Sequence, residues 1–161
     1  MRYFMFAAVL ALVGTSSQTF AIELRGAQIK PVHSDKCLDV SGGSTSAGTQ
    51  IIQFPCSGGA NQKWNIHDTG KGLHEIRAVH SDMCMDVSGA SLDNGAAVIQ
   101  FPCTGRTNQK FLLTALGDRF RIRSVHASKC LDVEGGSLFD NARLIQFECI
   151  KQNNNQRFRF K

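Results

Sequence analysis

The sequence predicts an all-β domain that is built from three copies of one unit and held together by disulfide bonds. Three observations carry this prediction. The first two are that a block of nine residues returns at a nearly constant interval and that six cysteines return with it. The third observation is the pattern inside each unit, where short runs of alternating apolar residues are separated by clusters of Gly, Ser, Asn and Asp. This pattern is typical of short strands joined by turns, and no run favours a long helix.

Each unit contains the same three blocks in the same order. The first block is Val32–Val40, Val79–Val87 and Val125–Val133. The second block is Ile52–Cys56, Ile99–Cys103 and Ile145–Cys149, and the third is Asn61–Trp64, Asn108–Phe111 and Asn155–Phe158. Cys37 and Cys84 are 47 positions apart and Cys84 and Cys130 are 46 apart, so the period hardly varies. A fixed period indicates a repeat architecture, here with units over residues of about 26–71, 72–118 and 119–161.

Residues 1–21 have the pattern of a secretory signal peptide. Arg2 supplies a positive charge, residues 4–13 are apolar, and small and polar residues follow. The apolar run is too short to span a membrane, since a spanning helix needs about 20 residues. We expect cleavage after Ala21, with Ser17 as the alternative, and a secreted protein that is either extracellular or periplasmic.

The remaining chain, 22–161, is expected to form one domain around one core. Without residues 1–21 it has 17 Lys and Arg against 13 Asp and Glu, a net charge of +4. These charges are scattered along the chain, whereas nucleic-acid-binding proteins usually gather Lys and Arg on one face or helix. We therefore expect no nucleic-acid partner and no membrane span.

The six cysteines of an exported chain indicate disulfides, because the compartments outside the cytoplasm are oxidising. A pairing with the symmetry of the repeat joins each first-block cysteine to a second-block cysteine of the same, the next or the preceding unit. The pairing within one unit is the simplest of these. It gives the pairs Cys37–Cys56, Cys84–Cys103 and Cys130–Cys149, each 19 positions apart.

The motifs Cys-Leu-Asp-Val, Gln-Phe-Pro-Cys and Asn-Gln-x-Trp/Phe resemble the repeats of ricin B-type lectins, which also occur in family 13 carbohydrate-binding modules. The resemblance covers residues of about 26–161. It implies a β-trefoil, with four strands per unit, a six-stranded barrel and three hairpins that cap it around a pseudo-three-fold axis. It also implies binding of glycans or polysaccharides, with no cofactor, no metal and no catalysis.

The resemblance assigns three residues per unit to a sugar site: an Asp, an aromatic residue and an Asn. Ionised Asp forms strong hydrogen bonds with hydroxyls, and an aromatic face suits the C–H side of a sugar ring. The expected carbohydrate-binding residues are Asp39, Phe54, Asn61, Asp86, Phe101, Asn108, Asp132, Phe147 and Asn155. If Leu38 and Val40 face the core, alternation along the strand turns Asp39 the other way. The bland alternative is that these polar residues only cap turns and satisfy backbone groups.

Two sets of glutamines are expected to support the site rather than contact sugar: Gln53, Gln100 and Gln146 before the aromatic residue, and Gln62, Gln109 and Gln156 after the Asn. Galactose-binding members of the family carry a Gln two positions before the aromatic residue, where this chain has Ile52, Ile99 and Ile145. Because a shift of one position on a strand reverses the face, galactose specificity is not implied. The aromatic residues of the third block, Trp64, Phe111 and Phe158, are expected in the core.

The third unit departs from the other two, with Glu148 in place of proline, Ala142 aligned with Gly48 and Gly95, and one extra residue after Cys149. We rank its site below the others. His33, His80 and His126 recur once per unit, so we expect structural hydrogen bonds from them and no shared metal site.

Intrinsic catalysis is not expected, because a catalytic set is asymmetric and everything recurrent here recurs three times. The prediction is a lectin with up to three shallow sites that act by avidity. Two other interpretations remain open, a trefoil that binds a protein partner, such as a toxin-associated subunit, and a hydrolase inhibitor.

Overall fold

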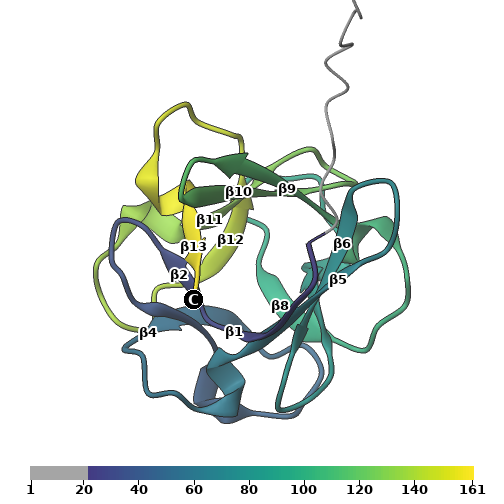
Figure 1. Cartoon of the computed structure of the whole chain (residues 1–161), viewed down its shortest axis with the longest axis horizontal. Coiled ribbons are helices and arrows are strands. Elements are labelled where there is room, and N and C mark those ends of the chain that lie inside the picture. The colour runs from purple at the N-terminus through teal and green to yellow at the C-terminus, as the bar shows by residue number, and fades with distance from the viewer. Residues whose placement is uncertain (1–21) are drawn as a thin grey trace, which may run out of the picture.

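The strands of this computed structural model, which describes residues 22–161, form a closed barrel and a cap of three hairpins (Figure 1). The expected signal peptide and both cleavage positions lie outside the described residues. The first repeat contains β1 (Leu24–Ala27), β2 (Ile29–Pro31), β3 (Cys37–Val40), β4 (Ile51–Phe54) and β5 (Trp64–Asp68). The second contains β6 (Leu73–Ala78), β7 (Cys84–Val87), β8 (Val98–Phe101) and β9 (Phe111–Leu116). The third contains β10 (Arg119–Ser124), β11 (Cys130–Val133), β12 (Leu144–Phe147) and β13 (Phe158–Phe160).

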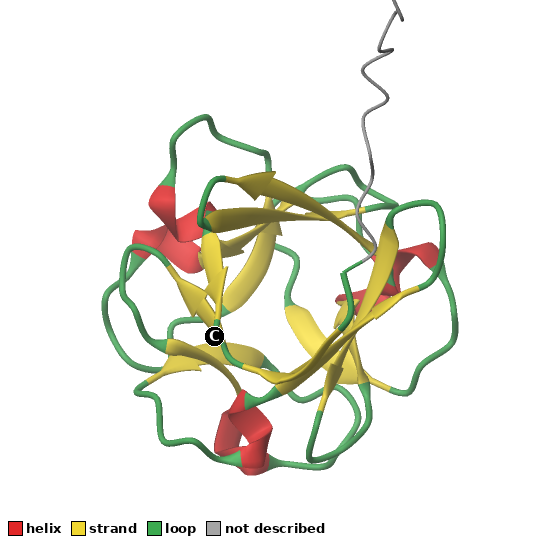
Figure 2. Ribbon diagram, viewed as in Figure 1, coloured by secondary structure: helices red, strands yellow, loops and turns green. Residues whose placement is uncertain are grey.

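Six short 3-10 helices connect these strands, two in each repeat, and they gather at three places around the rim (Figure 2). They are η1 (Ser41–Gly43), η2 (Ala60–Gln62), η3 (Ser88–Ala90), η4 (Thr107–Gln109), η5 (Glu134–Gly136) and η6 (Asn154–Gln156). Between residues 22 and 161 no helix is long and apolar enough to cross a membrane.

The barrel closes through the pairs β1–β5, β5–β6, β6–β9, β9–β10, β10–β13 and β13–β2. The hairpins β3–β4, β7–β8 and β11–β12 form the cap. This is the expected β-trefoil, with one difference in the first repeat. The first barrel strand of that repeat, which corresponds to β6 and β10, is split at Gln28 into β1 and β2. The backbone of Gln28 exchanges two hydrogen bonds with that of Lys161.

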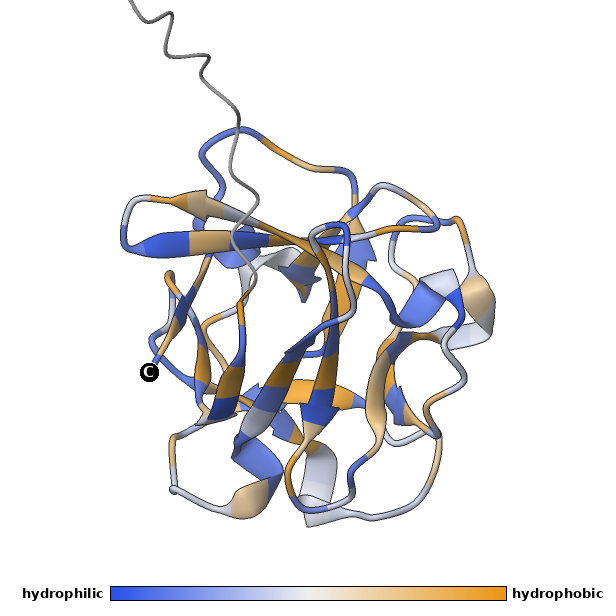
Figure 3. Ribbon diagram, turned by 45° about the vertical axis from the view of Figure 1, so that its right-hand side comes forward, coloured by the Kyte–Doolittle hydropathy of each residue, from blue (hydrophilic) through white to orange (hydrophobic). Residues whose placement is uncertain are grey.

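Apolar stretches lie on the strands (Figure 3). Buried side chains from the barrel and from the cap hairpins form one hydrophobic cluster. Trp64, Phe111 and Phe158 are fully buried there, which confirms their predicted place in the core. The indole Nε1 of Trp64 donates to the carbonyl oxygen of Leu38 at 3.1 Å, so its one polar atom is satisfied.

Disulfides join Cys37 to Cys56, Cys84 to Cys103 and Cys130 to Cys149, which is the pairing within each repeat. Each bridge fixes the chain that follows a cap strand to the start of that hairpin. In a chain-entropy model a closed loop of this size contributes about 3 kcal/mol through the unfolded state.

A single side chain, Gln50, interrupts the symmetry of the cap. Its Nε2 lies 2.7, 2.8 and 2.9 Å from the carbonyl oxygens of Ile51, Val98 and Leu144, the equivalent residues of the three repeats. Ala97 and Arg143 occupy the equivalent positions of the other repeats. Gln50 therefore links all three hairpins at the pseudo-three-fold axis.

Candidate functional site

Each repeat forms one open pocket beside its cap hairpin, and each pocket is lined by the expected Asp, Phe and Asn. Site 1 contains Asp39, Phe54 and Asn61, with a cavity of about 470 Å³. Site 2 contains Asp86, Phe101 and Asn108, with a cavity of about 290 Å³. Site 3 contains Asp132, Phe147 and Asn155, with a cavity of about 510 Å³. The fold thus brings together all nine residues in the grouping expected from the sequence.

The aspartates face their pockets because of strand alternation. Leu38 and Val40 are fully buried in the core, and Asp39 lies between them on the opposite face of β3. The pocket side is nevertheless covered, because only 5% of the Asp39 surface is exposed. The sequence predicted the direction of this side chain but not its depth.

A glutamine holds each aspartate in place. Gln62 donates from Nε2 to Oδ2 of Asp39 at 2.8 Å and to the carbonyl oxygen of Pro55 at 2.9 Å. Its Oε1 accepts from the backbone N–H of Ser57 at 2.7 Å. Gln109 and Gln156 make the same contacts with Asp86 and Asp132. These buried amides fix the orientation of the carboxylates, and Gln62 also lines site 1.

The other glutamines connect neighbouring repeats. Gln53 is fully buried, and its Nε2 donates to the carbonyl oxygens of Ser137 and Phe139 at 2.7 and 2.8 Å. Gln100 and Gln146 make the equivalent bonds to the loops of the first and second repeats. A loop of one repeat therefore borders the pocket of another, and Asn141 of the third repeat lines site 1.

The recurring histidines form hydrogen bonds with the same loops. Nε2 of His33, His80 and His126 lies 2.9 Å from the carbonyl oxygens of Ser137, Ser44 and Ser91, respectively. A carbonyl oxygen only accepts, so each Nε2 carries the proton. This is the structural hydrogen bonding expected of these residues.

Burial raises the pKa of Asp39, Asp86 and Asp132 above the usual value of an aspartate, although hydrogen bonds from the neighbouring Gln and Asn oppose the rise. In site 3, Asn155 donates to Oδ1 of Asp132 at 2.8 Å. Asn61 and Asn108 donate to the carbonyl oxygens of Val40 and Val87. The carboxylates are thus oriented to accept hydrogen bonds, although burial makes their ionised form less favourable than it is in water.

The aromatic residues are the accessible part of each site. Phe54 and Phe101 are 38% and 41% exposed, and Phe147 is half-buried. A partly exposed phenyl ring next to an oriented carboxylate offers one apolar and one polar contact surface.

The rest of the lining differs between sites. At the residue before the second 3-10 helix of each repeat, site 1 has Gly59, site 2 has Arg106 and site 3 has Asn153. Site 3 is also lined by Glu134, and the guanidinium of Arg143 donates hydrogen bonds to both oxygens of that carboxylate. These positions vary among the repeats and so carry no repeat signal by which the sequence could have identified them.

One detail of the third repeat corrects the sequence alignment. The residue equivalent to Gly48 and Gly95 is Asn141, not Ala142. The backbone N–H groups of all three donate to equivalent carbonyls, and all three have a positive φ. The extra residue comes only after Cys149, where Ile150 rather than a hydroxyl residue precedes the bend.

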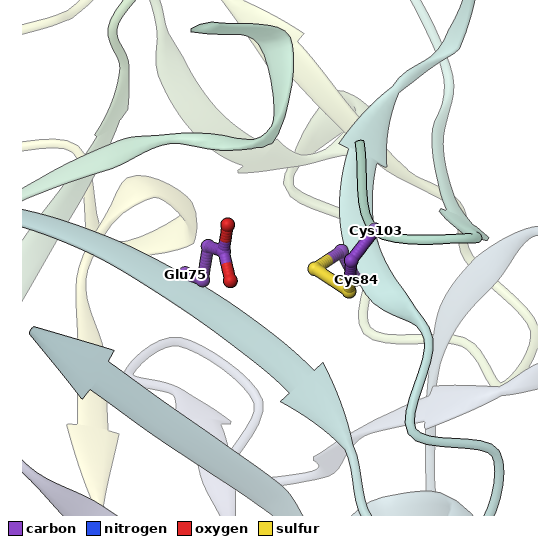
Figure 4. A group of neighbouring side chains, drawn as sticks. All are labelled: Glu75, Cys84 and Cys103. Atoms are coloured by element: carbon purple, nitrogen blue, oxygen red, sulfur yellow. A yellow bond between two sulfur atoms is a disulfide. The ribbon is translucent and has the colours of Figure 1, made fainter. Parts of the chain in front are cut away.

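A cluster of Glu75, Cys84 and Cys103 has the proximity of a metal site but not its chemistry (Figure 4). The two sulfur atoms are bonded to each other, so neither is a thiolate. The Glu75 carboxylate accepts from Lys110 at 2.6 Å and from Arg77 at 2.9 Å, which balances its charge. This cluster is an ion-pair network beside a disulfide.

Comparison with known proteins gives the family. The model of the ricin-type beta-trefoil lectin domain-like family matches residues 16–101, 60–147 and 107–161. The chain belongs to this family. Membership in a lectin family and the trefoil fold support a carbohydrate-binding protein.

Several known proteins are similar to this chain. The designed three-fold symmetric protein ThreeFoil is 39% identical, with 83% of this chain and 96% of that chain covered and a TM-score of 0.81. An exo-beta-1,3-galactanase from Clostridium thermocellum is 29% identical, with 88% of this chain but only 31% of that chain covered and a TM-score of 0.82. A seed lectin of Trichosanthes anguina is 47% identical over 34 residues, which is 21% of this chain and 7% of that lectin. The chain therefore resembles a small part of the seed lectin and about a third of the galactanase.

Proposed function

We propose that this protein is an exported lectin that binds glycans through up to three shallow sites and acts by avidity, without catalysis. The observation that carries the proposal is the Asp–Phe–Asn set, which lines an open pocket in each of the three repeats. The carboxylate accepts hydrogen bonds from neighbouring sugar hydroxyls, the Asn side chain supplies further polar contacts, and the C–H face of the ring lies on Phe.

Weak binding at each site follows from the shape of the pockets. They are open, and each offers to a sugar the carboxylate of the Asp, the small apolar ring of the Phe and the amide of the Asn. Such a site orders few groups, so monosaccharide affinity should be near millimolar, or about 4 kcal/mol. The pockets lie on different sides of the trefoil, one per repeat, so a glycan-coated surface can engage more than one. Engaging two or three sites raises apparent affinity by about 10² to 10⁴ when the spacing permits it.

The carboxylates themselves support a non-catalytic role. Site 1 and site 2 are each lined by one acidic residue, whereas glycoside hydrolysis uses two. Site 3 has a second carboxylate, Glu134, but hydrogen bonds from Arg143 lower the pKa of Glu134. Arg143 binds both oxygens of this carboxylate, so Glu134 is the partner in an ion pair rather than a free second carboxylate.

The test compares a free monosaccharide with the same sugar displayed densely on a polymer, using the wild type and variants that keep one intact site. Two of the three substitutions Asp39→Asn, Asp86→Asn and Asp132→Asn remove two sites at a time. Asp82→Asn is the control, because Asp82 lies outside the pockets and its positive φ tolerates Asn. We expect the polymer's advantage to collapse in the one-site variants and to persist in the control. An advantage that is unchanged with one site would contradict the avidity proposal, and no glycan binding by the wild type would contradict the lectin proposal.

A second candidate function, binding of a protein partner, is favoured by one loop. Leu138 and Phe139 are 63% and 82% exposed at the tip of the third hairpin. Exposed apolar side chains of this size can mark an interaction surface. If Phe139→Ser abolished binding to cells while binding to the glycan polymer stayed intact, a protein partner would be the better explanation.

A further inference from the structure

Site 2 differs from the other two sites by one cation at its rim. Arg106 lines the pocket together with Asp86 and Phe101 and is exposed to solvent. It precedes η4 with φ −70° and ψ 160°, and Gly59 precedes η2 with φ −61° and ψ 154°. The backbone is therefore the same at both places, and the difference between the two sites lies in the side chain.

The guanidinium of Arg106 has no counterion of its own. Over residues 22–161, no ion pair within 4.0 Å and no side-chain hydrogen bond involves it. By contrast, Arg143 beside site 3 is paired with Glu134, and no basic residue lines site 1. Site 2 thus combines a buried carboxylate with an exposed, unpaired guanidinium.

We propose that site 2 selects sugars that carry an anionic substituent, either the carboxylate of a uronic acid or a sulfate ester. This inference rests on the proposed lectin function and names the ligand class of one of its sites. The hydroxyls of such a sugar bind Asp86, its ring lies on Phe101, and its anionic group is directed to Arg106. A guanidinium matches the planar fork of a carboxylate and the oxygens of a sulfate, and an anion placed there gains a charge-assisted bond.

Electrostatics gives sites 1 and 3 the opposite preference. In site 1, Asp39 is the only charged residue of the lining, so an anionic sugar is repelled. In site 3, Asp132 and Glu134 line the pocket, and Arg143 already neutralises Glu134. The three sites of one molecule therefore differ in the charge of the sugar they accept. Because Arg106 is exposed, solvent and salt moderate its effect, and we expect about a 3- to 10-fold preference at low salt.

The experiment measures the affinity of each site separately by NMR, using the side-chain amide signals of Asn61, Asn108 and Asn155 as reporters. The probes are galactose and galacturonic acid, glucose and glucuronic acid, and galactose 6-sulfate. Each acid differs from its neutral partner only at C6, and the sulfate separates the two kinds of anion. The variants are Arg106→Gln, which removes the charge, and Arg106→Lys, which keeps it. Arg25→Gln is the control, because Arg25 is exposed and lies outside all three sites.

We expect an acidic probe to bind site 2 about 3- to 10-fold more tightly than its neutral partner, and 0.5 M NaCl to remove most of this difference. Arg106→Gln should abolish the preference by lowering the affinity of the acidic probe at site 2 to that of its neutral partner. Arg106→Lys should keep part of it, and Arg25→Gln should keep all of it. Transfer of Arg to position 59 is not a clean test, since a Cβ at Gly59 would lie 2.7 Å from Oδ1 of Asn61.

Two results would overturn the inference while leaving the lectin function in place. One is neutral and acidic probes binding site 2 equally, and the other is Arg106→Gln weakening both probes alike. If no probe moved any of the three reporters even at high concentration, the proposed function itself would fail.

Discussion

Acid should weaken sugar binding before it weakens the fold, and Asp86→Asn should reproduce that effect at neutral pH. The carboxylate of Asp86 accepts from Gln109 at 2.7 Å and is 5% exposed. Burial raises its pKa, so protonation in the folded protein begins at a higher pH than in an unfolded chain. Protonation turns an acceptor oxygen into a donor, and sugar hydroxyls lose the ionised partner that the site holds for them.

The sign of the stability effect is opposite to that of the binding effect. A raised folded-state pKa means that Asp86 adds stability below its unfolded value of 3.8 and loses this contribution as the pH rises through the folded value. Glu75 behaves in the reverse way: burial raises its pKa, but the hydrogen bonds and charges of Lys110 and Arg77 lower it on balance. Its contribution is therefore complete above the unfolded value of 4.5 and is lost below that value. Between pH 7 and 4.5 neither group unfolds the protein.

The size of the binding effect follows from the change in acceptor. A hydrogen bond to a charged group contributes about 1.5 to 3 kcal/mol and a neutral one about 0.5 to 1.5, so neutralising Asp86 should cost about 1 to 2 kcal/mol. This corresponds to about a 5- to 30-fold loss of sugar affinity at site 2. Starting from a millimolar Kd, such a loss would make binding at this site very weak. Asn is the better replacement than Ala, because its Oδ1 can still accept from Gln109.

The assay is a sugar titration of the wild type and of Asp86→Asn from pH 7 down to 3.8, with the Asn108 amide signal as the reporter and circular dichroism as the check of folding at each pH. The affinity of the wild type at site 2 should decrease as the pH is lowered, and the midpoint of this decrease should lie above pH 3.8. The variant should be weak at every pH. An Asp86→Asn protein that bound sugar as well as the wild type at pH 7 would refute the assigned role of this carboxylate.

Three further predictions concern the scaffold. Gln50→Ala should lower the free energy of unfolding by about 1 to 3 kcal/mol, measured by urea denaturation, because an NH₂ group has two hydrogens and supplies about two net bonds to the three carbonyls at the axis; a loss under 0.3 kcal/mol would show that water replaces it. Replacing both Cys84 and Cys103 by Ser should cost about 2 to 4 kcal/mol, with site 2 losing sugar affinity and the other sites keeping theirs. Phe139→Ala should change neither stability nor sugar binding by more than about 0.5 kcal/mol, since the ring is 82% exposed; a large loss of binding would show that the Phe139 ring itself contacts sugar.

Features that recur in every repeat could be predicted from the sequence, whereas features that occur only once could not. The motif positions predicted three repeats of short strands and, as the simplest of three symmetric pairings, the disulfide pairs. The resemblance to ricin B-type lectins implied the barrel, the core position of Trp64 and the grouping of each Asp, Phe and Asn. Alternation predicted the direction of the Asp39 side chain but not its burial, because burial depends on contacts with residues far along the chain, such as the hydrogen bond from Gln62. Gln50 was missed because it occurs once, at a position where the other repeats have Ala97 and Arg143.

Contacts between repeats could not be predicted from the sequence for a different reason. The bonds from Gln53 to the loop at Ser137 join residues 84 positions apart, and periodicity says nothing about which loop lies beside which strand. The alignment error at Asn141 has another cause, since the sequence already contains the answer: Gly48, Gly95 and Asn141 each lie five positions before the glutamine of the second block. Their shared positive φ and equivalent hydrogen bonds confirm this equivalence.

The symmetry of the scaffold has a consequence for function. Gly42, Gly89 and Gly135 have φ of 64°, 63° and 64°, so the turns beside the three carboxylates have nearly the same backbone shape. The residues that recur in every repeat build this shared frame and the shared part of the site. Any difference in ligand preference must then come from side chains that vary at equivalent places, as at Arg106. Because the frame is the same, the unmutated sites of each variant serve as internal controls for the mutated one, and a change seen at all three sites would indicate damage to the scaffold instead of altered recognition.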